Sequence, residues 1–251
     1  MNTSDLLNLV EEEILPKDYL KVLPVSVMEI APMGKNGIRK EADFNKSSRT
    51  GYSPFPFEVA ETCAALFLRD SKLTVDPFAG WGERGAAMKR HNKEYIGFDL
   101  SPEAIQNAFE KYGVVNNLAD SRTVDVPQHD GLFTCPPYWN LEKYAGEKGL
   151  DKCKGWDTFL IEYRDILTRF ANKADQNATY CLMTGDWRRD NVYYDLSFQT
   201  DLIMSTLGFK PFDKVVVSRL SISKIKIMLP QAKRMGYTVK VHENLFVYKR
   251  S

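Results

Sequence analysis

The sequence predicts an α/β protein in which helices cover both faces of a mostly parallel sheet. Short apolar runs of strand length alternate along the chain with amphipathic runs of helix length, which is the pattern of such a sheet. Glycine, proline and helix-capping residues separate these runs. The 251 residues, 43% of them hydrophobic, suffice for one globular domain with a sizeable core.

Residues 1–54 differ from the rest of the chain and are expected to form an N-terminal arm. An amphipathic helix is expected at residues 3–15, ended by Pro16. Residues 16–54 contain several prolines and glycines and are expected to be irregular, and long loops of this kind are often functional. Residues 55–251 are expected to form one compact domain, without a large separate recognition domain.

The first half of this domain alternates helices and strands. Its clearest helix start is Ser101-Pro102-Glu103, because serine caps a helix N-terminus and proline fits the first turn. We expect strands at residues 73–75, 94–98 and 114–118, and helices at residues 57–69, 84–91 and from Ser101 to about residue 112.

The second half continues the alternation. Gly208 and Gly236 are placed to end two of its helices. The last segment, residues 237–248, is expected to be either one long strand or a closing hairpin. The other expected strands lie at residues 131–134, 179–183 and 214–217, and the expected helices at residues 157–171, 195–207 and 221–235.

Composition excludes several classes of protein. No apolar run is long enough to span a bilayer, and the N-terminus lacks the basic start and apolar centre of a signal peptide, so a cytoplasmic protein without a membrane partner is expected. The four cysteines form no CxxC pair and the three histidines show no metal-ligand spacing. Neither a metal site nor a disulfide framework is therefore expected.

The net charge of +1 gives no overall basic field that would indicate a polyanionic partner. Local basic clusters exist, and a solvated face is the commoner explanation for each. Nucleic-acid binding would require that they converge on one side. The clusters are Lys35, Arg39, Lys40, Lys46 and Arg49; Arg188 and Arg189; and Lys224, Lys226, Lys233 and Arg234.

The most informative stretch is Thr134-Cys135-Pro136-Pro137-Tyr138-Trp139. It follows Gly131-Leu132-Phe133, a short apolar run expected to be a buried strand. Two prolines stop a strand and fix an extended turn, and ligands bind at the carboxyl ends of strands in open α/β sheets. A rigid turn with carbonyls beside an aromatic ring suits a flat, amino-bearing group such as a nucleobase. The alternative is a strand-ending turn with core aromatics.

A glycine-rich loop, Asp76-Pro77-Phe78-Ala79-Gly80-Trp81-Gly82-Glu83-Arg84-Gly85, follows the first strand of the domain and opens a helix. It has the GxGxxG spacing, and Asp99 ends the next strand 19 residues after Gly80. Any adenosine-containing cofactor needs these two features, a close backbone approach and an acid for the ribose diol. A nicotinamide cofactor is less favoured, because Asp76 can meet a cationic amino group. A turn that only packs on the sheet is the third alternative.

These segments together resemble the S-adenosylmethionine-dependent DNA amino-methyltransferases, which make N4-methylcytosine or N6-methyladenine. DPFAGWG, IGFDLSPEAI and CPPYW carry the resemblance, which extends over roughly residues 44–249. Flanking segments at Ser53–Phe57, Thr184–Arg188 and His242–Asn244 also resemble the family. The resemblance implies a Rossmann-like class I methyltransferase with a seven-stranded sheet and an antiparallel C-terminal strand. It also implies DNA methylation of the restriction-modification kind.

The resemblance implies roles for individual residues. Asp76 and the glycine turn would hold the methionine moiety of S-adenosylmethionine, Asp99 the ribose and Asp120 the adenine amino group. The implied cofactor-binding residues are Phe55, Asp76, Phe78, Gly80, Gly82, Asp99 and Asp120. The implied catalytic residues are Cys135, Pro136, Pro137 and Tyr138, and the implied substrate-binding residues are Trp139, Arg188 and Arg189.

The chemistry of the implied reaction fits these groups. Acceptors aimed at the N–H groups of an exocyclic amine favour a pyramidal nitrogen whose lone pair points at the methyl donor, and holding the two in line supplies much of the rate. The base must leave the duplex, at a cost of roughly a few kcal/mol, which stacking on Tyr138 can offset. Double-stranded DNA is the expected partner. Whether the protein is a monomer or a dimer stays open.

The chain departs from the family at four positions. Cys135 stands where the family usually has Asp, Asn or Ser, and a thiol is a weak hydrogen-bond acceptor. Trp81, Glu83 and Arg84 replace the small and hydroxyl residues common after the first glycine. These departures put the contacts to the target amine and to the cofactor carboxylate in question.

Several functions stay open on the sequence alone. Cytosine N4 is slightly favoured over adenine N6, because a small residue precedes Pro136-Pro137 and Tyr-Trp follows them. The similar motif Ser-Pro-Pro-Tyr is commoner among the enzymes that methylate cytosine N4. RNA or protein-glutamine methylation is an alternative, and so is a catalytically weak cofactor-binding relative. Recognition of DNA would rest on residues 16–54, Arg188-Arg189 and residues 219–237, and is expected to be short or relaxed.

Overall fold

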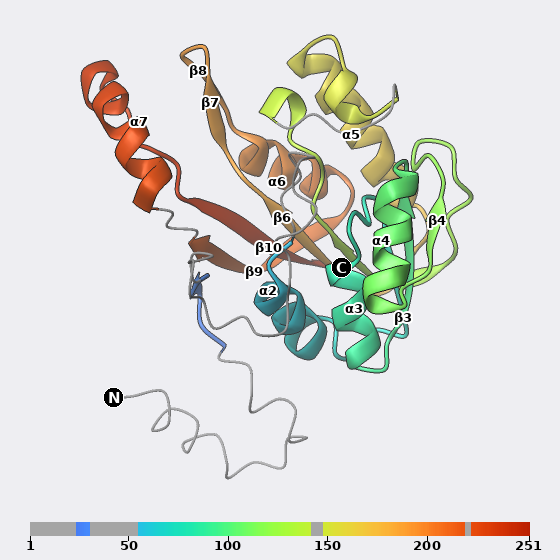
Figure 1. Ribbon diagram of the computed structural model, residues 1–251. Coiled ribbons are helices and arrows are strands. Elements are labelled where there is room, and N and C mark those ends of the chain that lie inside the picture. The colour runs from blue at the N-terminus through green and yellow to red at the C-terminus, as the bar shows by residue number, and fades with distance from the viewer. Residues whose placement is uncertain (1–23, 31–54, 142–147, 219–221) are drawn as a thin grey trace, which may run out of the picture.

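The computed structural model describes residues 24–30, 55–141, 148–218 and 222–251. The helix expected at residues 3–15 and most of the arm at 16–54 lie outside the described residues. Residues 142–147, which follow the Cys-Pro-Pro-Tyr turn, also lie outside them. The described residues otherwise form one α/β body (Figure 1).

An eight-stranded sheet lies at the centre of this body, in the order β1-β9-β10-β6-β5-β2-β3-β4. Strand β10 runs antiparallel to both β6 and β9, and the other pairings are parallel. The expected mostly parallel sheet with an antiparallel C-terminal strand is therefore confirmed. The strands are β1 (Val27–Glu29), β2 (Leu73–Asp76), β3 (Glu94–Asp99), β4 (Asn116–Leu118), β5 (His129–Thr134), β6 (Ala174–Thr184), β9 (Phe209–Ser218) and β10 (His242–Arg250).

The eighth strand, β1, was not expected. It has three residues and pairs in parallel with the end of β9, Val27 opposite Val216. Its segment carries no alternation long enough to indicate a strand, so its extended form depends on pairing with a partner nearly 190 residues away. The prediction for residues 237–248 was partly right: one strand forms, but it begins at His242.

Helices cover both faces of the sheet. One apolar cluster packs α5 and α6 against β2, β5, β6 and β10, and a second packs α2 and α3 against β5, β6, β9 and β10. Helix α7 extends away from the sheet (Figure 1). The helices are α2 (Phe57–Thr62), continued by a π-helical turn at Cys63–Phe67, α3 (Glu83–Arg90), α4 (Pro102–Tyr112), α5 (Trp156–Ala171), α6 (Leu196–Thr206) and α7 (Ile222–Met235).

Helix α4 forms as its sequence predicts. The Ser101 hydroxyl accepts a hydrogen bond from the Ala104 amide at 3.2 Å, and Pro102 occupies the first turn. Gly113 ends the helix in the left-handed conformation, at φ 62°. These caps fix where β3 ends and α4 begins, and so place Asp99 at the carboxyl end of β3.

A short hairpin, β7 (Trp187–Arg189) and β8 (Val192–Tyr194), was missed by the sequence analysis. Asp190 and Asn191 form its two-residue turn with φ of 49° and 64°. Both residue types tolerate the left-handed region, and two such residues form the turn that suits the twist of a hairpin. The hairpin begins just after β6 and carries Trp187 and Arg188 next to the site described below.

Candidate active site

A cavity of about 530 Å³ opens where β2, β3, β5 and β6 end. Its volume is in the range of small-molecule and cofactor sites, and its position at the carboxyl ends of the strands is where open α/β sheets bind ligands. The expected site residues that line it are Phe55, Phe78, Gly80, Asp99, Asp120, Cys135, Pro136, Pro137, Tyr138 and Arg188. Asp76, Gly82, Trp139 and Arg189 are expected site residues that do not line it.

Asp76 is fully buried beneath the cavity floor. Its carboxylate accepts hydrogen bonds from the Phe78 amide at 3.0 Å, the Thr134 hydroxyl at 2.6 Å, Arg84 Nε at 2.7 Å and the Tyr95 hydroxyl at 2.9 Å. Four donors use the acceptor capacity of both oxygens. In this arrangement Asp76 joins β2, β5 and α3.

Arg84 stands between Asp76 and the cavity. Its guanidinium also donates to the Phe78 carbonyl and lies 4.9 Å from the centre of the Phe55 ring. Burial lowers the pKa of this guanidinium, but Asp76 more than offsets that, and the net shift is upward. A permanently charged arginine thus replaces one of the family's small residues and borders the cavity.

Glu83, the first residue of α3, is nearly buried and also lines the cavity. Burial raises the pKa of its carboxyl group, against the opposing effects of backbone hydrogen bonds, Arg84 and Lys111. A buried carboxylate with a raised pKa gains from a nearby cation. Glu83, and not Asp76, therefore presents a carboxyl group to the cavity.

The glycine turn and Asp99 form one unit. Gly80 and Gly82 have φ of 56° and 96°, and a Cβ on Gly82 would lie 2.6 Å from the Ala108 side chain. Asp99 accepts hydrogen bonds from the Gly80 amide at 2.7 Å and the Ser101 amide at 2.8 Å. Burial raises the pKa of Asp99, against those two hydrogen bonds. Gly82 thus acts through packing, while Gly80 and Asp99 face the cavity.

Asp120 lies at the cavity wall beyond β4. Its carboxylate is bound by the Arg122 guanidinium at 2.7 Å, and Arg122 also pairs with Glu162 at 2.8 Å. The hydrogen bond from Arg122 lowers the pKa of Asp120, with burial opposing it. Asp120 is therefore held as a carboxylate, and Arg122, which also lines the cavity, was missed by the sequence analysis.

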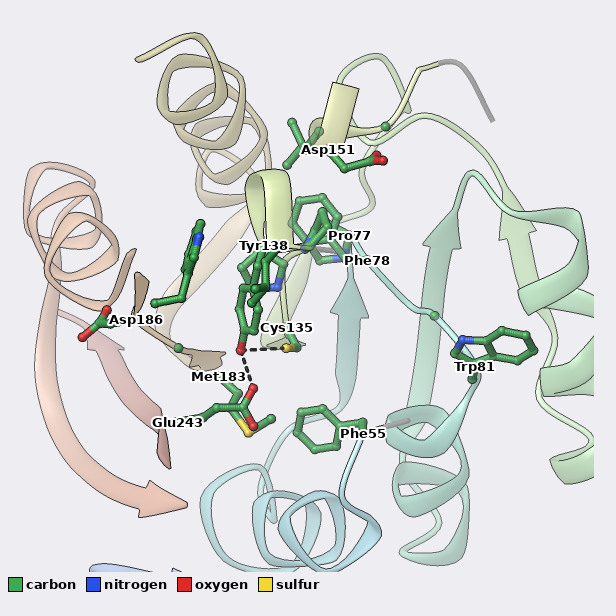
Figure 2. Close-up of a pocket in the computed structure, with 18 of the residues that line it drawn as sticks. Phe55, Pro77, Phe78, Trp81, Cys135, Tyr138, Asp151, Met183, Asp186 and Glu243 are labelled. Atoms are coloured by element: carbon green, nitrogen blue, oxygen red, sulfur yellow. Dashed lines mark hydrogen bonds between the residues drawn. The ribbon is translucent and has the colours of Figure 1, made fainter. Parts of the chain in front are cut away.

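The Cys-Pro-Pro-Tyr turn presents Tyr138 to the cavity (Figure 2). The Tyr138 hydroxyl donates to Glu243 Oε1 at 2.5 Å and lies 4.0 Å from Cys135 Sγ. Trp187 stacks on the Tyr138 ring, with centroids 5.7 Å apart and planes 26° apart. The ring is thereby fixed at its edge and on one face.

Trp187 and Glu243 were missed as site residues. Trp187 is 5% exposed and packs on Tyr194 and Trp156 as well as on Tyr138, so it is a wall of the site and part of the core. The sequence marked the segments that contain both residues, Thr184–Arg188 and His242–Asn244, as similar to the family. It held no signal that these segments meet Tyr138.

The remaining expected substrate-binding residues have different environments. Trp139 packs against Trp156 and Tyr194, and its indole donates to the Cys153 carbonyl at 2.8 Å. Arg189 donates to the Asn140 carbonyl. Both stabilise the turn after the prolines.

Arg188 lines the cavity mouth and packs on two aromatic rings, Tyr193 at 5.4 Å and Tyr237 at 4.8 Å from their centres. Lys240 Nζ lies 5.0 Å from the centre of the same Tyr193 ring. Two cations are thus held side by side with aromatic rings at the entrance.

Other features of the described residues bear on chemistry. The four cysteines are present as free thiols. No group of three or more potential metal ligands occurs among the described side chains. In the same part of the chain, no helix has the length and apolar character needed to cross a membrane.

Comparison with known families supports the resemblance found in the sequence. Residues 35–110 match the family model N6_N4_Mtase, described as DNA methylase. The resemblance to DNA amino-methyltransferases is confirmed. The matched segment contains the glycine turn and Asp99, and S-adenosylmethionine is the cofactor that this family implies. No curated protein matches the chain.

Solved structures share the fold. TrmN from Thermus thermophilus is 16% identical with a TM-score of 0.50, over 78% of this chain and 49% of that chain, so this chain spans about half of it. The magnesium protoporphyrin IX methyltransferase of Synechocystis PCC 6803, with bound SAH, is 11% identical with a TM-score of 0.52, over 78% and 83%. NodS from Bradyrhizobium japonicum, also with bound SAH, is 11% identical with a TM-score of 0.51, over 78% and 88%. At these identities the likeness shows the class I methyltransferase fold.

Proposed function

We propose that this protein transfers a methyl group from S-adenosylmethionine to the exocyclic amino group of a base flipped out of double-stranded DNA, with cytosine N4 favoured over adenine N6. One observation carries the proposal. The Cys135-Pro136-Pro137-Tyr138 turn and the Gly80–Asp99 unit line the same cavity. A group held by the glycine turn and a flat amine held by the proline turn therefore share one enclosed space.

The residues of the cavity fit the cofactor. Asp99 lies at the end of β3 beside the Gly80 backbone, where a ribose diol can be bound. Glu83 and Arg84 offer opposite charges to an amino acid end group. When bound, S-adenosylmethionine supplies an electrophilic methyl group. Phe55 and Phe78 close the apolar side of the same space.

Tyr138 is the proposed platform for the base. Stacking of a base on an aromatic ring contributes roughly 1–3 kcal/mol, which offsets much of the few kcal/mol that flipping costs, by the usual order of magnitude. The Pro136 carbonyl is the proposed acceptor for an amine N–H. Pro137 fixes the direction of that carbonyl, because its ring restricts the backbone on both sides.

Arg188 and Lys240 are the proposed phosphate contacts at the entrance. Both line the cavity mouth, and Arg188 is held by two tyrosines. Contacts to phosphate dominate the affinity for DNA and make it depend on salt. Specificity would then rest on the β7–β8 hairpin and neighbouring residues, in keeping with a short or relaxed target.

The proposal is tested by methyl transfer from tritium-labelled S-adenosylmethionine to unmethylated DNA, bulk RNA and protein extract in parallel. We expect label in DNA and loss of at least tenfold in rate for Tyr138→Ala. Label in RNA or protein alone would contradict the proposal and select the corresponding alternative. Calorimetry on the same samples measures binding of S-adenosylmethionine. It distinguishes a protein that binds the cofactor but transfers no methyl group from one that does not bind the cofactor.

A further inference from the structure

Glu243 lines the same cavity as the cofactor residues and contacts Tyr138 of the Cys-Pro-Pro-Tyr turn. It is the second residue of β10, pairs with Val217 of β9 across the sheet, and lines the cavity. Figure 2 shows its carboxylate directed toward Tyr138 and Cys135. The hydrogen bond from the Tyr138 hydroxyl to Oε1, at 2.5 Å, fixes the carboxylate there.

Gly185 makes room for this contact. A Cβ at position 185 would lie 3.2 Å from Cγ of Glu243 and 3.3 Å from the Tyr138 hydroxyl. Both distances are tighter than ordinary side-chain contacts, so a larger residue would push the carboxylate and the ring apart. The residue that follows strand β6 is thus of the type that lets Glu243 and Tyr138 meet.

Cys135 leaves a chemical need unmet. Its thiol occupies the position where the resemblance places a carboxylate, amide or hydroxyl, and sulfur accepts hydrogen bonds weakly. The Tyr138 hydroxyl contacts both groups, 4.0 Å from Cys135 Sγ and 2.5 Å from Glu243 Oε1. The Tyr138 hydroxyl therefore lies between the Cys135 thiol and the Glu243 carboxylate and contacts both.

We propose that Glu243 supplies the charged acceptor for the N–H of the target amine that the thiol of Cys135 does not supply. This inference rests on the proposed function, because it assumes an amine held at the Cys-Pro-Pro-Tyr turn. A hydrogen bond to a carboxylate is roughly twice as strong as a neutral one. The acceptor is then a residue of β10 and not the residue at position 135 of the turn. Tyr138 orients this acceptor through its hydroxyl and stacks on the base with its ring.

The test moves the carboxylate from one position to the other at constant charge. Methyl transfer is measured for Glu243→Gln, for the double variant Glu243→Gln with Cys135→Asp, and for Glu94→Gln, an exposed carboxylate at the amino end of β3. We expect Glu243→Gln to lower kcat by roughly 10- to 100-fold, the effect of losing a hydrogen bond to a charged group. The double variant should recover at least tenfold, and Glu94→Gln should match the parent.

Unchanged kcat in Glu243→Gln, or a double variant no faster than the single one, would overturn the inference. Cofactor binding by calorimetry should be equal in all four proteins, which shows that each is folded. A merely structural role for Glu243 predicts that moving the carboxylate to position 135 restores nothing.

A second measurement needs no turnover and so separates this inference from the proposed function. Saturation-transfer NMR with S-adenosylhomocysteine present compares cytidine with N4,N4-dimethylcytidine, which has no amine N–H to donate. We expect cytidine to bind the parent protein, and Glu243→Gln to lose that signal. Dimethylcytidine should not bind either protein. That pattern in a protein that labels no DNA would support Glu243 and refute the DNA substrate. Equal binding of both nucleosides to the parent would overturn the role of Glu243.

Discussion

Asp76 and Arg84 form a buried ion pair, with oxygen and nitrogen 2.7 Å apart, and it offers the sharpest test of how the site is built. The side chains are 0% and 6% exposed, respectively, so neither charge is screened by water. Changing Asp76 to Asn keeps the shape but leaves Arg84 without a counter-charge. The amide nitrogen would also face donors from Thr134 or Tyr95. Breaking one partner of such a pair costs about 3–5 kcal/mol.

The size of the effect on melting follows from chain length. For a chain of this size each kcal/mol shifts Tm by roughly 2–4 °C, so Asp76→Asn should lower Tm by about 6–20 °C. Replacing both charges, as in Asp76→Asn with Arg84→Met, should recover most of the loss, because apolar replacement of a buried pair is often neutral. Differential scanning calorimetry of the single and double variants measures both.

The same variants test whether Asp76 binds the cofactor. We expect Asp76→Asn to bind S-adenosylmethionine within a fewfold of the parent at temperatures well below its Tm, since Asp76 faces inward. An unchanged Tm together with lost cofactor binding would contradict a purely structural role for Asp76. It would instead favour the direct role that the family resemblance implies.

Three further predictions concern other parts of the site. Arg122 lowers the pKa of Asp120 in the folded protein, so the stabilisation from Asp120 is complete above the ordinary Asp pKa range and is lost as pH falls below about 4. In urea unfolding experiments, Asp120→Asn should lose less free energy of unfolding on acidification than the parent protein, and an equal loss would contradict the pairing. Arg188→Gln should weaken DNA binding and reduce the slope of log affinity against log salt concentration by roughly the value of one phosphate contact. The same slope for the variant and the parent protein would exclude that contact. Tyr138→Phe keeps the stacking face of the ring but loses the hydrogen bond to Glu243, so kcat should fall more than DNA affinity. Equal losses in kcat and affinity would contradict separate roles for the ring and the hydroxyl.

The order of elements and the position of the site could be predicted because they depend on local signals. Ser101 and Pro102 mark the start of α4, Gly113 its end, and the two prolines after Cys135 the end of β5. Each acts within a few residues of its own position. The carboxyl ends of the neighbouring parallel strands must then lie together, so Gly80, Asp99 and Tyr138 could be placed in one cavity before the fold was known.

The contacts between distant segments could not be predicted. Asp76 pairs with Arg84, which lies 8 residues later in the chain, yet nothing in the loop sequence shows that both side chains face inward. Glu243 meets Tyr138 across 105 residues, because β10 inserts antiparallel between β6 and β9. Strand β1 depends on β9 in the same way. The Glu243–Tyr138 contact and strand β1 follow from the strand order and register of the sheet, which a sequence pattern does not encode.

The cavity is proposed to be the place where an exocyclic amine of DNA is methylated. The most direct test is nucleoside mass spectrometry of unmethylated duplex DNA incubated with the protein and S-adenosylmethionine, with Tyr138→Ala as the control. We expect N4-methylcytosine, or N6-methyladenine in its place, at levels that fall in the control. DNA without either nucleoside, from a protein that binds the cofactor, would contradict the proposal.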